Sequence, residues 1–96
     1  MARYVALINW TDQGIRNYKD TAHRGEAFGA MLESMGSRLV DLVWTLGTYD
    51  IVAIIEAPDD ETMTNAMLKL GVLGNVRTTT MRAFTGEEIE RIVARG

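Results

Sequence analysis

Two short segments of this chain place apolar side chains on both sides of the strand that each would form. The first spans residues 3–10 and the second spans residues 50–57. Their alternating sets are Val5/Leu7 and Ala6/Ile8/Trp10 in the first segment, and Ile51/Ala53/Ile55 and Val52/Ile54 in the second. β-branched and aromatic side chains favour strands, and a strand without a polar side has no face suited to water. Both segments are therefore predicted to be central strands of a sheet.

Apolar residues at three- and four-residue intervals predict two helices. A broken helical stretch precedes a regular helix over residues 21–35, which ends at Gly36. The second helix starts at Asp59 or Asp60, either of which can cap its first turn, and extends to about Leu73. The apolar stripes consist of Ala27, Phe28, Met31, Leu32 and Met35 in the first helix and of Met63, Ala66, Met67 and Leu70 in the second.

Two further segments predict strands at the edges of the sheet. Residues 38–46 have a mixed pattern and are joined to the next strand through a hairpin at Gly47. Their alternating sets are Val40/Leu42/Trp44 and Leu39/Asp41/Val43. Residues 76–84 are rich in threonine and carry two arginines, as expected of a half-solvated edge. The spacing of Thr85 and Glu88 is that of a capping box, which predicts a short terminal helix.

The order of these elements predicts an α+β fold of the ferredoxin-like βαββαβ type. We expect one domain over residues 1–96, with a four-stranded antiparallel sheet, two helices on one face and an added C-terminal helix. Gly25 and Gly29 share one face of the first helix, which predicts close packing of that helix on the sheet. The two strands that are central in this topology are the two that are apolar on both sides, so pattern and topology agree.

Two helices cover only one face of such a sheet, and the apolar residues of the other face need a separate cover. A partner's sheet or a ligand can supply it. We predict a homodimer packed sheet to sheet. An interface of this obligate type buries about 2,000 Å² or more in total.

Composition excludes several classes of function. The chain of 96 residues contains no cysteine and has a formal net charge of −3. Disulfides and thiolate metal sites are thereby ruled out, and an acidic balance disfavours nucleic acid as a partner. No apolar run approaches the roughly 20 residues of a membrane span, and no secretion signal is visible, so we expect a cytoplasmic protein. A lone His23 is better explained as a solvated helix residue than as a ligand, and we predict neither a metal site nor a cofactor.

Polar and aromatic residues gather near the predicted strand ends and are the candidate ligand-binding residues. They are Asn9, Trp10, Trp44, Tyr49, Asp50, Asn75 and Arg77. We expect them not to form one cluster, because the end of the first strand and the start of the third need not share one end of the sheet. Structural roles in turns and in the core explain most of them. In a pocket, Asp50 or Arg77 would orient the ligand.

Several stretches of the chain resemble the GYD domain family. The segments that carry the resemblance are Tyr4-Val5, residues 9–17, Trp44-Thr45-Leu46-Gly47-Thr48-Tyr49-Asp50, residues 56–60 and residues 73–78. The family is named after a Gly-Tyr-Asp element, and here Thr48 is interposed. The resemblance implies a small bacterial or archaeal protein with a ferredoxin-like fold of the dimeric α/β-barrel type, and it implies no established reaction.

We therefore consider two main hypotheses of function. The first is a noncatalytic homo-oligomer that binds a small molecule or a protein partner at the sheet face or dimer interface. The second, which rests on analogy of fold alone, is a cofactor-independent oxygenase or isomerase acting on a small aromatic substrate in the barrel pocket. No nucleophile or nucleotide-binding motif supports catalysis, and the residues to test would be Asn9, Trp44, Tyr49 and Arg77. A third possibility is assembly into larger rings.

The uncovered sheet face generates a direct prediction of subunit number. Native mass spectrometry of the purified protein should give a dimer, either free or with a discrete small-molecule mass. A monomer at micromolar concentration would show that the second apolar face has another explanation.

Overall fold

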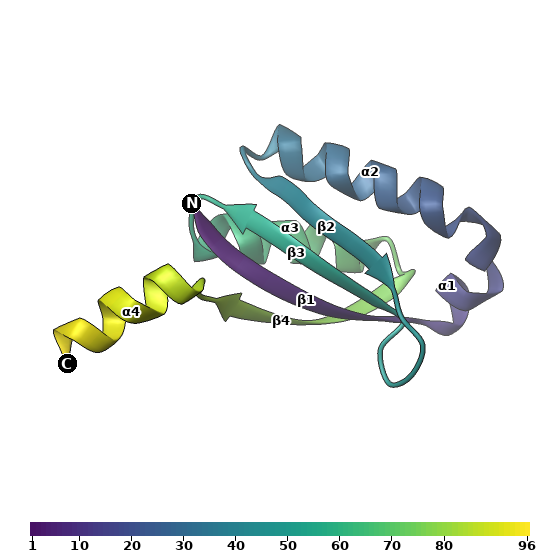
Figure 1. Ribbon diagram of the computed structural model, residues 1–96. Helices are drawn as coiled ribbons and strands as arrows, with labels where there is room; N and C mark the ends of the chain where they lie inside the picture. The colour runs from purple at the N-terminus through teal and green to yellow at the C-terminus, as the bar shows by residue number, and fades with distance from the viewer.

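The computed structural model describes residues 1–96 and contains one antiparallel sheet. Its strands are β1 (Ala2–Trp10), β2 (Arg38–Trp44), β3 (Ile51–Ala57) and β4 (Val76–Ala83). Hydrogen bonds join them in the order β2-β3-β1-β4 (Figure 1). The two strands that are apolar on both sides, β1 and β3, are therefore the central pair, as predicted.

The helices begin and end close to the predicted residues. They are α1 (Asp12–Arg16), the short 3-10 helix η1 (Tyr18–Asp20), α2 (Thr21–Ser34), α3 (Asp60–Val72) and α4 (Gly86–Arg95). Asp59 caps α3 by accepting a hydrogen bond from the Thr62 N–H at 2.8 Å. The capping box of Thr85 and Glu88 is present at the start of α4. Gly36 ends α2 with a φ of 69°, a conformation that glycine adopts without strain.

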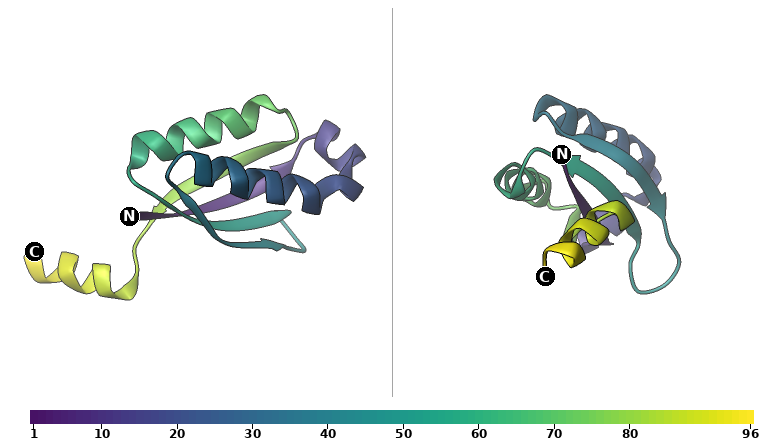
Figure 2. Two further views of the ribbon diagram at one scale, coloured as in Figure 1. Left: turned by 90° about the horizontal axis from the view of Figure 1, so that it is seen from above. Right: turned by 60° about the vertical axis from the view of Figure 1, so that its left-hand side comes forward.

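Helices α2 and α3 lie side by side over one face of the sheet (Figure 2). Beneath them, one alternating set of β1 and β3 forms the core together with Phe28 and Leu32 of α2 and Met63 and Ala66 of α3. The strand residues of this core are Tyr4, Ala6, Ile8, Ile51, Ala53, Ile55 and Ala57. The predicted ferredoxin-like fold is confirmed.

The pattern predicted for β2 is wrong at one point. Its pairing with β3 shifts between Leu39 and Asp41, which marks a β-bulge. Because Leu39 pairs with Ile55 and Leu42 pairs with Ala53, both leucines face the helices. The simple alternation in the sequence had put them on opposite faces.

Close packing of α2 on the sheet is confirmed at both glycines. A Cβ atom added at Gly25 would lie 2.8 Å from Cδ2 of Leu42, and one added at Gly29 would lie 3.5 Å from Cδ2 of Leu39. Both contacts are with β2, so the missing side chains let α2 approach the edge strand.

The opposite face of the sheet has no cover within the chain. Its central residues Val5, Leu7, Val52 and Ile54 are half-buried. Helix α4 does not lie over this face and continues past the end of the sheet instead (Figures 1 and 2). No residue of α4 is buried, although its apolar residues Ile89, Ile92 and Val93 recur at helical spacing.

No helix combines the length and the apolar character that a membrane span requires. The cytoplasmic location stays a prediction.

A matched pair of helical glycines tests the packing. A Cβ atom at Gly14 would lie 1.9 Å from the carbonyl oxygen of Asn75, whereas one at Gly71 meets open space. We expect Gly14→Ala to lower the free energy of unfolding by about 1–3 kcal/mol, because the backbone must move to relieve the clash. Gly71→Ala should leave stability unchanged or raise it by up to about 1 kcal/mol. Urea denaturation of both variants measures the difference, and equal stability would contradict this account.

Candidate functional site

The seven candidate residues lie at one end of the sheet, which corrects the expectation that they would not. Antiparallel pairing places Ile8, near the end of β1, opposite Ile51 at the start of β3. Trp10 pairs with Val76 at the start of β4, and Trp44 at the end of β2 pairs with Ile51. The ends of β1 and β2 therefore meet the starts of β3 and β4.

The sheet then divides the seven residues between its two faces. Asn9 and Arg77 are register partners on the open side of the sheet. Trp10, Trp44 and Asn75 instead line a cleft on the helix side. The candidates are thus neighbours at one end without forming one pocket.

The cleft lies between α2 and α3, above the ends of the strands. It has a volume of about 290 Å³, and most of its wall is apolar. The wall includes Ile8, Phe28, Met31, Leu42, Leu70 and Leu73. Its polar contributors are Thr21, Arg24 and Asn75, and no acidic residue lines it. A cleft of this composition suits a small, largely apolar ligand.

The two tryptophans of the cleft differ in their hydrogen bonding. The Trp44 indole N–H donates to the Thr21 hydroxyl at 2.9 Å, and its ring lies against Gly25. The indole nitrogen Nε1 of Trp10 is buried and has no hydrogen-bond partner in the chain. The Trp44 ring is therefore held in place as part of the cleft wall, whereas the indole N–H of Trp10 is a hydrogen-bond donor without an acceptor.

Arg24 is a functional candidate that the sequence analysis missed. Its guanidinium donates to the carbonyl oxygens of Asn17, at 2.9 Å, and Gly14, at 3.2 Å. These bonds tie α2 to the segment around α1. No carboxylate pairs with Arg24. From the sequence alone, an arginine in a helix that lines a cleft cannot be distinguished from one that is exposed to solvent.

Tyr49 and Asp50 shape the turn before β3. The Asp50 carboxylate accepts the backbone N–H of Trp10 at 2.9 Å, and the Tyr49 carbonyl accepts the Thr45 hydroxyl at 2.5 Å. Neither residue lines the cleft. The structural role in the turn therefore describes their observed contacts, and Asp50 does not face a ligand there.

Asn75 holds the start of β4 against the segment that follows β1. Its backbone carbonyl accepts the Thr11 N–H at 3.0 Å, and its side-chain oxygen accepts Nε2 of Gln13 at 3.0 Å. The Thr11 hydroxyl donates to the Gly74 carbonyl at 2.6 Å. These bonds hold Asn75, which lines the cleft, against the segment that follows β1.

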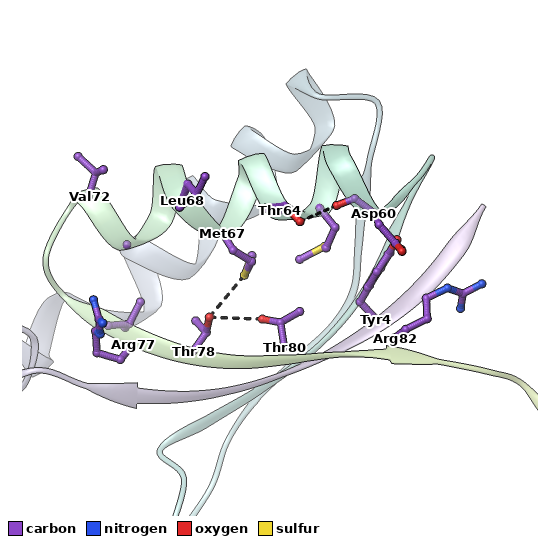
Figure 3. A pocket seen from close by; sticks show the side chains of 13 residues that line it. Tyr4, Asp60, Thr64, Met67, Leu68, Val72, Arg77, Thr78, Thr80 and Arg82 are labelled. Carbon is purple, nitrogen blue, oxygen red and sulfur yellow. Dashed lines mark hydrogen bonds between the residues drawn. The ribbon is translucent and has the colours of Figure 1, made fainter.

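A second hollow, which the sequence analysis missed, runs between α3 and the edge strand β4 (Figure 3). This α3–β4 groove has a volume of about 740 Å³. Thr78 and Thr80 form its floor on β4, and Leu68 and Val72 stand exposed on α3. Arg77 also borders it, because β4 is an edge strand past which a long side chain can extend. Leu68 and Val72 are apolar but lie outside the predicted apolar stripe of α3. This departure from the stripe is the feature of the sequence that could have indicated the groove.

Tyr4 closes one end of the α3–β4 groove. Its side chain is 4% exposed, and its hydroxyl donates to the Asp60 carboxylate at 2.5 Å. Burial, reinforced by this hydrogen bond and the negative charge of Asp60, raises the pKa of Tyr4 to about 12. The guanidinium carbon of Arg82 lies 5.6 Å from the Tyr4 ring centre and 4.5 Å from that of Phe84.

The open sheet face is charged at the opposite end from the candidate residues. The Glu56 carboxylate lies between two arginines. Its Oε2 is 3.2 Å from Nη2 of Arg3, and its Oε1 is 2.6 Å from Nη2 of Arg38. Hydrogen bonds from Arg38 and Arg3 lower the pKa of Glu56. The centre of the same face is apolar, so this face combines an apolar middle with a charged rim, which is the anatomy of a protein interface.

Histidine and acidic residues do not gather anywhere in groups of three that could hold a metal ion. His23 is exposed on α2, as a solvated helix residue would be.

The sheet order and the two helices on one face define this chain as a ferredoxin-like α+β domain. A crystal structure of the protein TTHA0845 from Thermus thermophilus has the same fold, with a TM-score of 0.56 and 23% identity, covering 90% of this chain and 96% of that one. The chain belongs to the GYD domain family, whose model matches residues 4–93. The family resemblance seen in the sequence is thereby confirmed.

A relative from Thermus thermophilus is 34% identical over 85 residues, which cover 88% of this chain and 90% of the relative. It is named glutamine synthetase and cystathionine beta-lyase binding protein. The relative is therefore described as a protein that binds enzymes.

The buried tyrosine generates a prediction of pH dependence. An unfolded tyrosine loses its proton near pH 10, whereas folded Tyr4 retains it up to a pKa of about 12. The stabilisation is complete below pH 10 and is lost as the pH rises to 12. Tyr4→Phe should flatten the fall in the free energy of unfolding over this range, as measured by urea denaturation.

Tyr18→Phe is the matched control, because Tyr18 is 53% exposed. It should follow the unmodified protein at every pH. A fall of equal steepness in the Tyr4→Phe variant would show that other groups cause it.

Proposed function

We propose that this chain is a homodimeric, noncatalytic protein that binds a partner enzyme in the α3–β4 groove. The observation that carries the proposal is the pair of exposed apolar side chains, Leu68 and Val72, beside the unpaired edge of β4. Leu68 is 64% exposed and Val72 is 86% exposed. Apolar side chains grouped at a hollow are a feature of protein-binding surfaces.

The edge of β4 supplies the second half of the groove. β4 is eight residues long and pairs only with β1, so its outer backbone groups are free. An extended peptide segment can add to such an edge through main-chain hydrogen bonds while its alternate side chains enter the adjoining hollow. We infer a partner segment with apolar side chains directed at Leu68 and Val72.

Charge favours an acidic residue in the same partner segment. Arg77 lines the groove and has no ion-pair partner in the chain. An acidic side chain in the bound segment can pair with it at the end of the groove that lies away from Tyr4. Electrostatic complementarity of this kind fixes the register of a bound segment.

The name of the relative supports an enzyme as the partner. Identity of 34% over 85 residues covers nearly all of both chains. The first partner to test is therefore glutamine synthetase, followed by cystathionine beta-lyase, each taken from the same organism as this protein.

The open sheet face supports the dimer. Its half-buried centre of Val5, Leu7, Val52 and Ile54 would become fully buried against the same face of a second copy, because a twofold interface uses one patch on both subunits. Helix α4 continues past the sheet with its apolar residues exposed, and a second copy lying on the open face would bring a surface within its reach.

Catalysis as an oxygenase or isomerase has less support from the geometry. The four residues named for it do not share one hollow: Asn9 lies on the open sheet face, and only Trp44 lines the cleft between α2 and α3. Arg77 lines the α3–β4 groove, and Tyr49 lies in the turn before β3. The cleft wall contains no aspartate, glutamate, histidine, lysine or tyrosine to move a proton.

The partner experiment uses the exposed position of the two α3 residues. Leu68→Glu/Val72→Glu should reduce the affinity for glutamine synthetase at least tenfold in isothermal titration calorimetry, because charge replaces apolar contact at the groove. The fold should be retained, since neither side chain is in the core. Lys69→Glu makes a comparable charge change on α3 outside the groove and should bind normally.

Equal affinity of the double variant and the unmodified protein would move the partner site away from the groove. No binding by the unmodified protein to either enzyme would reject the proposed class of partner.

The dimer is tested at exposed positions of the open face. Val43 and Met81 are each 44% exposed and lie on this face as partners of Val52 and Val5. Val43→Glu/Met81→Glu should therefore produce folded monomers in native mass spectrometry. A dimer that persists in this variant would place the interface elsewhere.

A further inference from the structure

The cleft between α2 and α3 has a chemical character that the binding of a partner protein in the α3–β4 groove does not use. The cleft and the groove are separate hollows on either side of α3. The cleft is lined mainly by apolar side chains and has two polar groups with unused hydrogen-bonding capacity, the Trp10 indole N–H on β1 and the Arg24 guanidinium on α2. We propose that it is a binding site for a small apolar carboxylate.

The first feature is the indole N–H of Trp10. The nitrogen is buried without a hydrogen-bond partner, although Trp10 lines the cleft. A buried donor left unpaired destabilises the folded chain. The other indole of the cleft, that of Trp44, has its donor satisfied by the Thr21 hydroxyl. The Trp10 nitrogen has no accessible surface of its own, so an acceptor group of a ligand would satisfy it once the indole turns toward the cleft.

The second feature is the charge of Arg24. It is the only ionisable residue in the cleft wall, and no carboxylate of the chain pairs with it. Two backbone carbonyls hold its guanidinium in place and use two of its five donors. The remaining donors can bind an anion, and arginine has the planar geometry that matches a carboxylate.

The absence of acidic residues from the wall determines the sign of the ligand charge. With one cation and no anion, the cleft favours a negatively charged group and disfavours an amine. The apolar remainder of the wall then requires that the rest of the ligand be a hydrocarbon or an aromatic ring. Phe28, Met31 and Leu70 provide that surface.

The volume of the cleft limits the size of the ligand. About 290 Å³ lies at the lower end of the range for small-molecule sites. This volume suits a molecule of the size of an arylalkanoic acid.

The chain provides its own optical probe for the test. Its only two tryptophans, Trp10 and Trp44, both line the cleft. Tryptophan fluorescence should therefore respond to occupancy, and calorimetry provides the affinity. The probe pair is 4-phenylbutyrate and 4-phenylbutyramide, which have the same hydrocarbon part and differ in charge. The unmodified protein should bind the acid at least tenfold more tightly than the amide.

Three variants locate the preference for the acid. Arg24→Gln should lower the acid affinity to that of the amide, and Trp10→Phe should weaken binding of the acid several-fold. Trp44→Phe is the matched control, because its indole donor is already used by Thr21. Because Trp44 also forms part of the cleft wall, this variant should change the affinity for the acid and for the amide alike and so retain the preference for the acid. Ala27→Leu, an exposed position in the cleft wall, should block both probes.

The comparison of acid and amide in the unmodified protein requires no variant and remains informative if Arg24→Gln fails to fold. Equal affinity for the two probes, or no binding of either, would overturn the proposal. Binding of the acid that persists in Ala27→Leu would place the anion outside the cleft. None of these outcomes bears on glutamine synthetase binding, which is measured at a different surface.

Discussion

The pairing of β1 with β3 is the interaction on which the other features of the structure depend. Ala6 pairs with Ala53, and both are completely buried beneath the helices. Small side chains at this central position let α2 and α3 lie close to the sheet, while the larger Ile55 and Leu32 fill the remaining space. The same antiparallel pairing brings the end of β1 to the start of β3. The candidate residues are gathered there for this reason.

The position of α3 creates two hollows of different character. Met63 and Ala66 attach α3 to the core, and the helix leaves β4 partly uncovered on one side and α2 at a distance on the other. The open groove beside β4 has a free strand edge and exposed apolar side chains. The smaller, more apolar cleft beside α2 has an indole donor without a partner and an arginine without a carboxylate partner. An extended protein segment suits the first hollow, and a small anion suits the second.

Side-chain periodicity alone was enough to predict the fold, and the reason can be seen in individual elements. Apolar residues on both sides of β1 and β3 required a central position, and the capping residues Asp59 and Thr85 marked where α3 and α4 begin. The prediction failed at β2, where a bulge between Leu39 and Asp41 puts Leu39 and Leu42 on one face. A bulge inserts a residue without changing the local composition, so alternation could not reveal it.

The sequence by itself therefore determined the order of the elements, the central strands and the apolar nature of the open sheet face, because each follows from local periodicity and capping. Only the tertiary structure decided which candidates share a cleft. It placed Trp10 and Trp44 beside Arg24 and kept Asn9 and Arg77 out of that cleft. Whether an arginine is solvated or faces an apolar cleft, and whether an indole N–H finds a partner, depends on residues distant in the chain. Such contacts are fixed by the packing of the layers.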